Sequence, residues 1–200
     1  MFSREYRDLA HVPRWSIIPV VKRQSVAEHS YFVALYAIEI CRVIGVPSSD
    51  LASILIYAIQ HDRSECYISD IPGPVKRGAG IKDNIYNYER KEDFSYFGDT
   101  LNPSDFEKAT IKVADLMDEF AYWWEEARVG NYYAMQMKSV ILIRLKSAAY
   151  NLAGKVSINR FQTERDLINP FLESLDVDKI APLDNSDVAS PPIEDGECPF

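Results

Sequence analysis

The sequence has few cysteines and no long apolar run, and each shortage excludes a class of protein. Its three cysteines, Cys41, Cys66 and Cys198, are too few and too scattered for a disulfide framework, and none forms a Cys-x-x-Cys pair for zinc or redox chemistry. The longest apolar run, at positions 140–143, is far shorter than a membrane span, and the first ten residues are charged where a signal peptide would be apolar. We therefore expect a protein of the reducing cytoplasm, without an export signal or a membrane anchor.

Basic residues are also in short supply. There are 22 Lys and Arg against 30 Asp and Glu, a formal net charge of −8, which disfavours tight binding to nucleic-acid polymers or anionic membranes. Residues 176–200 hold seven acids against Lys179 alone, a net charge of −6, so residues 1–175 carry only −2. Because the last segment also contains four prolines and little apolar content, we predict one folded domain over 1–175 and an extended or mobile acidic tail over 176–200.

Apolar residues are plentiful, at 47% of the chain, and they recur with helical period. Capping boxes at 25–28 and 104–107 mark two helix starts, and Gly45 and Gly154 are expected to stop helices. The two prolines in the segment 72–74 predict an extended stretch. No segment alternates with period two, so the sequence predicts an all-α bundle of six or seven helices. The expected helices span 25–44, a segment from Ser48 or Ser49 that carries His61, Asp62 and Glu65 in its last turns, 81–97, 104–130, 132–153 and 160–175.

Only three histidines occur, His11, His29 and His61. His29 lies in line with apolar residues of its predicted helix and so faces the core, where a single histidine is more often hydrogen-bonded to a neighbouring helix than bound to a metal. The pair His61-Asp62 follows an apolar helical stripe, and Asp115 lies on another predicted core helix, where an unpaired carboxylate would be costly. Two imidazoles and two carboxylates make a mixed set of ligands that suits Mn, Fe, Co, Ni or Zn.

These four candidate ligands, in their order along the chain, resemble the H…HD…D signature of the HD-domain metal-dependent phosphohydrolases, which are all-α. Arg14-Trp15 and the segments 25–30 and 61–76 narrow the resemblance to bacterial 5'-deoxynucleotidases and to compact phage triphosphohydrolases of deoxyadenosine triphosphate. The resemblance covers residues 10–130. The two histidine motifs are 32 positions apart, and the last Asp follows the His-Asp pair by 53 positions. This compact spacing is closer to the phage enzymes, because the bacterial nucleotidases carry a longer insertion before the last Asp.

The resemblance implies roles for residues around the metal. Arg14 and Lys76 would bind phosphate. Trp15 would pack against the sugar or base so as to disfavour a ribose 2'-hydroxyl, and Asp70 would bind the 3'-hydroxyl; Trp15 could equally be a core residue. From its place one helical turn beyond the ligands, Glu65 can orient the attacking water or exchange its proton, and the alternative is an exposed glutamate at a helix end.

Other charged residues near these motifs are open to two interpretations. Lys22, Arg23 and Arg77 are further candidates for phosphate binding, although each could be a solvated surface base. Asp118 and Glu119 lie within a turn of the last candidate ligand and could support it. For these two acids the sequence favours ordinary solvated side chains.

We therefore predict a divalent-metal-dependent phosphohydrolase in which Asp62, Glu65 and Lys76 act in catalysis. The leading reaction converts a deoxynucleoside triphosphate, of the dATP type, to deoxynucleoside and triphosphate. One alternative is a 5'-deoxynucleotidase that converts a deoxynucleoside monophosphate to deoxynucleoside and phosphate, and another is a non-catalytic nucleotide-binding HD module. The expected cofactor is Co, Mn, Zn, Ni, Fe or Mg, and the expected partners are a small deoxynucleotide and further copies of the chain. A phage-encoded chain would act in the host cytoplasm.

Overall fold

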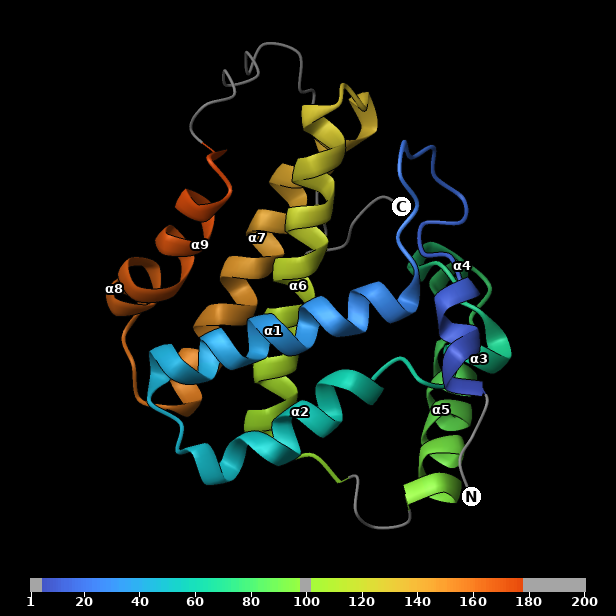
Figure 1. The fold of residues 1–200 in the computed structure, drawn as a ribbon, viewed down its shortest axis with the longest axis horizontal. Helices are drawn as coiled ribbons and strands as arrows, with labels where there is room; N and C mark the ends of the chain where they lie inside the picture. The colour runs from blue at the N-terminus through green and yellow to red at the C-terminus, as the bar shows by residue number, and fades with distance from the viewer. Residues whose placement is uncertain (1–4, 98–101, 178–200) are drawn as a thin grey trace.

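The computed structural model describes residues 5–97 and 102–177 (Figure 1). Within these ranges every regular element is a helix, and the only β-type contact is an isolated bridge between Pro13 and Ser25. The predicted all-α fold is confirmed. The predicted tail lies outside the described residues beyond Val177, so the domain boundary stays a prediction. The elements are η1 (Glu5–His11), α1 (Val26–Ile44), η2 (Ser48–Asp50), α2 (Leu51–Gln60), α3 (Glu65–Ile68), α4 (Gly73–Gly78), α5 (Lys82–Phe97), α6 (Asp105–Arg128), α7 (Tyr132–Lys155), α8 (Arg160–Thr163), the π-helical turn η4 (Glu164–Ile168) and α9 (Asn169–Ser174).

The two capping boxes that the sequence predicts begin α1 and α6. The Ser25 hydroxyl accepts a hydrogen bond from the Glu28 backbone N–H at 3.2 Å, while the Glu28 carboxylate accepts from the Ser25 N–H at 2.8 Å. Ser104 and Glu107 repeat the pattern at 3.2 Å and 2.7 Å. Gly45 ends α1 with a φ of 75°, a left-handed conformation that glycine adopts without strain. Both predicted helix starts are confirmed.

The predicted second helix is wrong at its C-terminal end. α2 stops before His61, residues 61–64 form a turn, and Glu65 begins the separate helix α3. His61 Nδ1 donates to the carbonyl of Ala58 at 2.7 Å, and the Glu65 N–H bonds only three residues back, to Asp62, at 3.0 Å. Because the His61 side chain competes for a helical acceptor, the motif lies on a tightened turn rather than on one helix face.

Three other boundaries differ from expectation. The segment 72–74 is not extended, because α4 begins at Gly73 with Pro74 in its first turn, where the missing N–H has no helical partner to lose. α7 continues through Gly154 for one further residue, since glycine weakens a helix interior without preventing it. The stretch 160–174 is helical throughout but contains the π-helical turn η4, and Leu175 caps its end.

α6 is the central helix of the bundle: α1 crosses it, α7 runs alongside it, and α2 also packs against it (Figure 1). It carries the three largest fully buried side chains, Phe120, Trp123 and Trp124. Trp124 Nε1 donates to the carbonyl of Leu175 at 2.7 Å and so ties the end of α9 to the core. Since α6 also carries Asp115, the packing of the core fixes the position of a candidate ligand.

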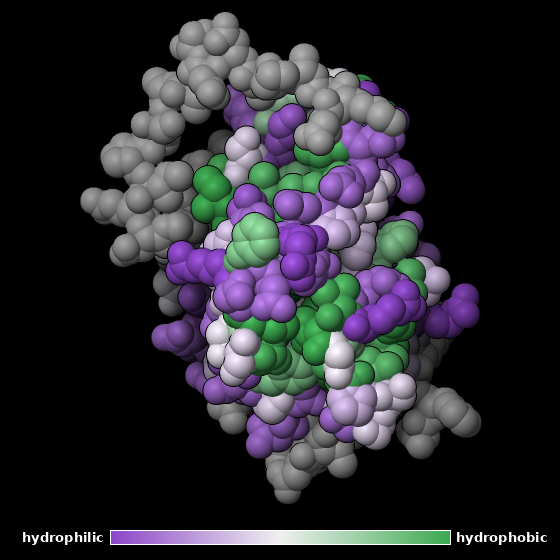
Figure 2. Space-filling view, turned by 90° about the vertical axis from the view of Figure 1, so that its left-hand side faces the viewer, coloured by the Kyte–Doolittle hydropathy of each residue, from purple (hydrophilic) through white to green (hydrophobic). Residues whose placement is uncertain are grey.

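The surface leaves some apolar side chains in solvent. Figure 2 shows the side of the molecule that carries α8 and α9, where hydrophobic residues gather in the lower half between hydrophilic ones. Phe161 of α8 is 74% exposed. Of the helices in the described ranges, none has both the length and the apolar character needed to span a membrane.

Phe120→Ala is expected to lower the free energy of unfolding by about 3–5 kcal/mol, because it leaves a cavity in the core beside Phe171. Phe161→Ala, the same substitution at an exposed helical position, is expected to change it by less than about 0.5 kcal/mol. Equilibrium denaturation in urea measures both. Equal losses in the two variants would contradict the central role of α6.

Candidate metal centre and nucleotide site

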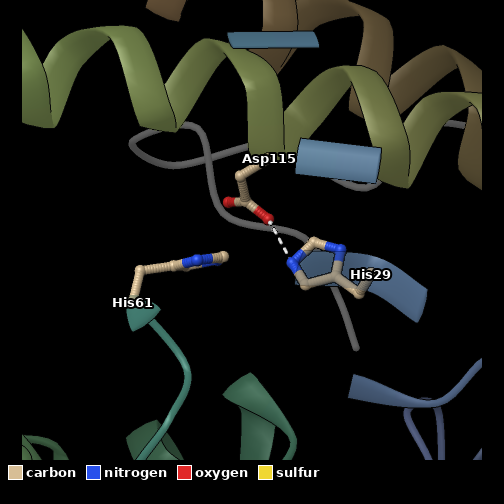
Figure 3. A group of neighbouring side chains, drawn as sticks. All are labelled: His29, His61 and Asp115. Carbon is tan, nitrogen blue, oxygen red and sulfur yellow. Dashed lines mark ion pairs between the residues drawn. The ribbon is translucent and has the colours of Figure 1, made fainter. Parts of the chain in front are cut away.

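The side chains of His29 and His61 extend toward the same region of the site (Figure 3), and the Nε2 atoms of both lie near Asp62 Oδ2. His29 Nδ1 donates to Asp118 Oδ2 at 2.6 Å, and His61 Nδ1 donates to the Ala58 carbonyl at 2.7 Å. The ring centroids are 5.3 Å apart. In a neutral imidazole with Nδ1 protonated, Nε2 carries the lone pair. In the described part of the chain neither Nε2 atom has a hydrogen-bond partner, although both are buried.

Two carboxylates complete the cluster. Asp62 Oδ2 lies 3.5 Å from His29 Nε2 and 3.3 Å from His61 Nε2, and Asp115 Oδ1 lies 3.4 Å from His29 Nε2. One ligand atom each from His29, His61 and Asp115 lie within 4.8 Å of one another. Neighbouring ligands of a tetrahedral zinc ion, each about 2.0–2.1 Å from the metal, are about 3.3–3.4 Å apart. The structure thus brings His29, His61 and Asp115 into a group that could hold a metal ion, with Asp62 Oδ2 beside the Nε2 atoms of both histidines.

The charges around Asp115 favour the ionised carboxylate. Lys112 Nζ lies 2.7 Å from Asp115 Oδ2, which leaves Oδ1 to face His29. Burial raises the pKa of Asp115, but Lys112, His29 and Arg14 outweigh it and hold the pKa far below its usual range. Burial, assisted by Arg14, holds the pKa of His29 well below its ordinary value. A carboxylate and a neutral imidazole are the protonation states that bind metals.

Glu65 lies beside these ligands even though it belongs to a different helix. It is buried as the first residue of α3, and its Oε2 has no hydrogen-bond partner within the described ranges. Burial, together with Asp62 and Asp70, raises the pKa of Glu65 to about 10. The alternative of an exposed glutamate at a helix end is therefore wrong, and Glu65 can hold a proton inside the site at neutral pH.

Arg14 and Trp15 lie on residues 13–25, which we call the strap. An isolated β-bridge joins its two ends, and the Arg14 N–H donates to the Gln24 carbonyl at 2.9 Å. The Arg14 guanidinium lies over the Trp15 ring at 5.0 Å and is mostly buried. Burial lowers the pKa of Arg14, but nearby acids, Asp115 first, raise it above its ordinary value. The strap therefore carries a permanent positive charge to the acidic ligand cluster.

Trp15 is held in an unusual backbone conformation. Its φ of 60° is left-handed, which is unfavourable for a bulky residue. The ring stacks on Tyr122 at 5.7 Å and meets the edge of Trp123 at 5.0 Å, so the strap is packed on α6 through this side chain. The Trp15 backbone also forms a hydrogen bond with Asp70. Burial raises the pKa of Asp70, although the positive charge of Arg14 opposes this shift. Trp15 and Asp70 are thus neighbours, and their roles toward a nucleotide stay predictions.

Lys76 lies on α4 and forms an ion pair with an acidic side chain of α5. Its Nζ is 3.7 Å from Glu89 of α5. It also lowers the pKa of both Glu65 and Asp70 through its charge. Its proximity to these acids agrees with the predicted phosphate-binding position, and its role stays a prediction.

The remaining candidate bases serve the strap or lie away from the ligands. Arg23 donates to the carbonyls of Arg14 at 3.4 Å and Trp15 at 3.1 Å, so it braces the strap from within. Lys22 lines a cavity of about 280 Å³ between the strap, α1 and α6, which Gln24 and Asp118 also line. The Arg77 side chain lies outside the described part of the chain.

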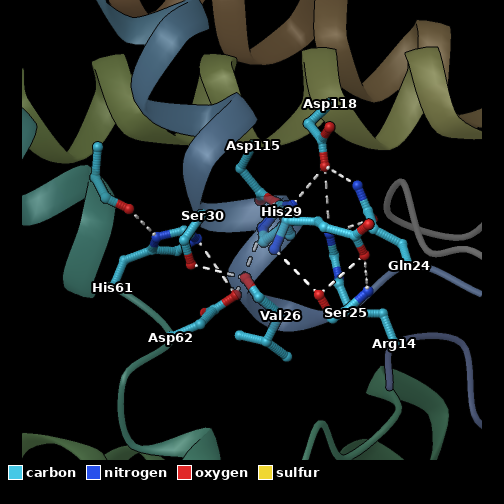
Figure 4. Close-up of polar contacts among 12 residues, drawn as sticks. Arg14, Gln24, Ser25, Val26, His29, Ser30, His61, Asp62, Asp115 and Asp118 are labelled. Carbon is cyan, nitrogen blue, oxygen red and sulfur yellow. Dashed lines mark hydrogen bonds and ion pairs between the residues drawn. The ribbon is translucent and has the colours of Figure 1, made fainter. Parts of the chain in front are cut away.

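The sequence-based interpretation of Asp118 and Glu119 as solvated acids is wrong. Both are buried on α6. Figure 4 shows the contacts of Asp118 with His29 and Gln24. Asp118 Oδ2 accepts from His29 and from Gln24 Nε2, the latter at 2.9 Å, and burial raises the pKa of Asp118 to about 6. Glu119 is 3.1 Å from Arg144 of α7. Their spacing from the last ligand, three and four residues along one helix, is the signal that could have identified them as inward-facing.

A second missed residue, Glu126, holds the strap on α6. Its carboxylate accepts from the backbone N–H groups of Val21 at 2.7 Å and Lys22 at 2.8 Å. Asn131 Nδ2 donates to the same carboxylate at 2.7 Å and to the Pro19 carbonyl at 3.0 Å. No local sequence pattern announces these contacts, because they join positions more than a hundred residues apart.

Comparison with known proteins gives several relatives. The chain is 28% identical over 144 residues to the dATP triphosphohydrolase of Salmonella phage PMBT28, which covers 68% of this chain and 73% of the phage enzyme. It is 26% identical over 146 residues to a 5'-deoxynucleotidase of Yersinia pestis (strain Pestoides F), which covers 64% of this chain and 74% of that one.

Solved structures share the fold. The cyanophage S-2L HD phosphohydrolase DatZ, bound to dA and one catalytic Zn²⁺ ion, superposes with a TM-score of 0.71 at 17% identity, covering 88% of this chain and 98% of that chain. The PH0347 protein of Pyrococcus horikoshii OT3 superposes with a TM-score of 0.60 at 24% identity, covering 76% and 94%. The family model of the YfbR-like 5'-deoxynucleotidases matches residues 1–162, most of the chain. The chain therefore belongs to the 5'-deoxynucleotidase YfbR-like family of HD-type deoxynucleotide phosphohydrolases.

Proposed function

We propose that this chain hydrolyses deoxynucleoside triphosphates of the dATP type to deoxynucleoside and triphosphate, at a metal centre held by His29, His61, Asp62 and Asp115. The proposal is carried by the Nε2 atoms of His29 and His61. Both are buried and have no hydrogen-bond partner in the described chain, and both lie next to carboxylates. Buried polar atoms are nearly always satisfied, so such a pair supports a ligand between them. A divalent ion bound there supplies a charge that lowers the pKa of a water and offsets charge on a phosphate oxygen.

The chain's own residues divide the remaining tasks. Glu65 orients the attacking water and exchanges its proton, which is consistent with a buried carboxyl that can hold a proton at neutral pH. The water oxygen joins the released triphosphate, the bond from phosphorus to the 5'-oxygen breaks, and the 5'-oxygen gains a proton. Arg14 binds phosphate, with Lys76 as a second positive charge. Trp15 and Asp70, neighbours in the structure, take the sugar.

Two observations bear on the choice of substrate. The dATP triphosphohydrolase is the more similar of the two curated relatives described above, and the phosphohydrolase whose fold superposes over 88% of this chain was solved with dA. They favour a triphosphate of the dATP type. The 5'-deoxynucleotidase activity is the second candidate, because the family model that matches residues 1–162 is described by it. Self-association stays a prediction.

The products released from dATP and dAMP decide between the two activities. Purified chain is incubated with each nucleotide and Mg, Mn, Co or Zn, and the inorganic product is identified by chromatography. We expect tripolyphosphate from dATP, no hydrolysis with a chelator, and no hydrolysis by Asp115→Asn, which lacks a carboxylate ligand. Orthophosphate from dAMP alone would favour the 5'-deoxynucleotidase, and no product from any deoxynucleotide would favour the non-catalytic module.

Glu65→Gln is expected to lower kcat by about 10²–10⁴-fold, the usual contribution of a positioned acid or base, while bound metal remains unchanged. Steady-state kinetics and metal analysis of the purified variant measure the two quantities. Glu39→Gln is the matched control, since Glu39 lies on the exposed face of α1 beside Arg42. A Glu65→Gln variant with the kcat of the unmodified chain would refute the role of Glu65.

A further inference from the structure

One carboxylate oxygen lies between the metal ligands and the strap (Figure 4). Asp118 Oδ2 accepts from His29 Nδ1 at 2.6 Å and from Gln24 Nε2 at 2.9 Å, and it faces an Arg14 guanidinium nitrogen at 3.6 Å. The other end of the Gln24 amide, Oε1, accepts from the same Arg14 nitrogen at 3.4 Å. Asp118 and Gln24 are both buried, at 3% and 7% exposure, so water does not compete for these contacts.

We propose that Asp118 is a positioning residue that orients the ligand His29 and, through Gln24, the phosphate-binding Arg14. Asp118 is not one of the proposed ligands; it meets His29 at Nδ1, while Nε2 of the same ring faces Asp62 and Asp115. The inference rests on the proposed function, because it takes His29 as a ligand and Arg14 as the phosphate contact.

The first effect concerns the imidazole. A carboxylate can only accept, so its contact with Nδ1 keeps the proton there and leaves the Nε2 lone pair toward Asp62 and Asp115. His29 is fully buried, and no other group is recorded at its Nδ1 in the described chain. Loss of a carboxylate behind a metal-binding histidine typically weakens metal affinity by about 10–100-fold.

The second effect concerns the direction of the Gln24 amide. Its nitrogen is a donor and its oxygen an acceptor, so the two orientations of the amide are chemically distinct. With Asp118 accepting from Nε2, Oε1 must face Arg14, which is a pure donor. The reverse orientation would place Oε1 against the carboxylate and the amide hydrogens against the guanidinium. Asp118 therefore sets which end of Gln24 meets Arg14.

Three variants separate these effects. Asp118→Asn is expected to weaken Co²⁺ and Zn²⁺ binding by about 10–100-fold and also to raise the KM for dATP at saturating metal. Gln24→Leu is expected to raise the KM by about tenfold or more, from the lost hydrogen bond to a charged group, with metal affinity within about twofold of the unmodified chain. Glu119→Gln, a buried carboxylate on the same helix held by Arg144 instead of His29, is expected to change neither.

Metal affinity is measured by competition with a chromophoric chelator, and thermal unfolding of each metal-free variant reports the fold. Unchanged metal affinity in Asp118→Asn overturns the proposal, as does an equal loss in Glu119→Gln. Unchanged KM in Gln24→Leu overturns the link to Arg14.

A measurement on the unmodified chain keeps the proposal testable should Asp118→Asn not fold. Long-range ¹H–¹⁵N spectra of the metal-free protein report the protonated ring nitrogen of each histidine. We expect Nδ1 for His29, and protonation at Nε2 would overturn the proposal. If no deoxynucleotide is hydrolysed, the proposed function is refuted but the role of Asp118 can still be tested. The metal affinities and the tautomer of His29 test the first effect. The Kd of dATP, measured by calorimetry, replaces KM as the test of Gln24→Leu.

Discussion

A carboxylate taken out of water must have a partner, and this requirement organises the whole site around α6. Four buried or half-buried acids of this helix contact other parts of the chain. Asp115 contacts the lysine one turn earlier and a histidine of α1, and Asp118 contacts the same histidine and the strap. Glu119 contacts an arginine of α7, and Glu126 contacts the backbone of the strap.

The same constraint explains how an acidic protein accommodates an anionic substrate. The net charge of −8 says little about the site, because Asp115 is already paired with Lys112 and His29, and Asp118 with His29 and Gln24. Arg14 lies among them with its positive charge reinforced by Asp115 and Asp62. Local pairing, rather than total charge, sets the field that a phosphate group meets.

Local patterns predicted much of the fold and identified residues that the fold brings together at the candidate metal centre. The capping boxes begin α1 and α6, and the inward face of α1 carries His29, because hydrogen bonds and periodicity over a few residues determine both. The turn at 61–64 escaped prediction, since α-helical and tightened turns differ little in free energy and the His61 side chain decides between them.

Contacts across a hundred positions could not be predicted from one sequence. Glu126 looks like any other acid of an amphipathic helix, and only the folded chain brings it to the strap. Tyr122 Oη donates to the Lys22 carbonyl. Glu126, Tyr122 and Asn131 therefore all form hydrogen bonds with main-chain atoms of the strap. Side chains between Ser16 and Lys22 can therefore diversify while the path of the strap is kept, provided that no proline removes a bonded N–H. The strap is thus held by its backbone, and it can tolerate substitution of its side chains because α6 recognises its path rather than its composition.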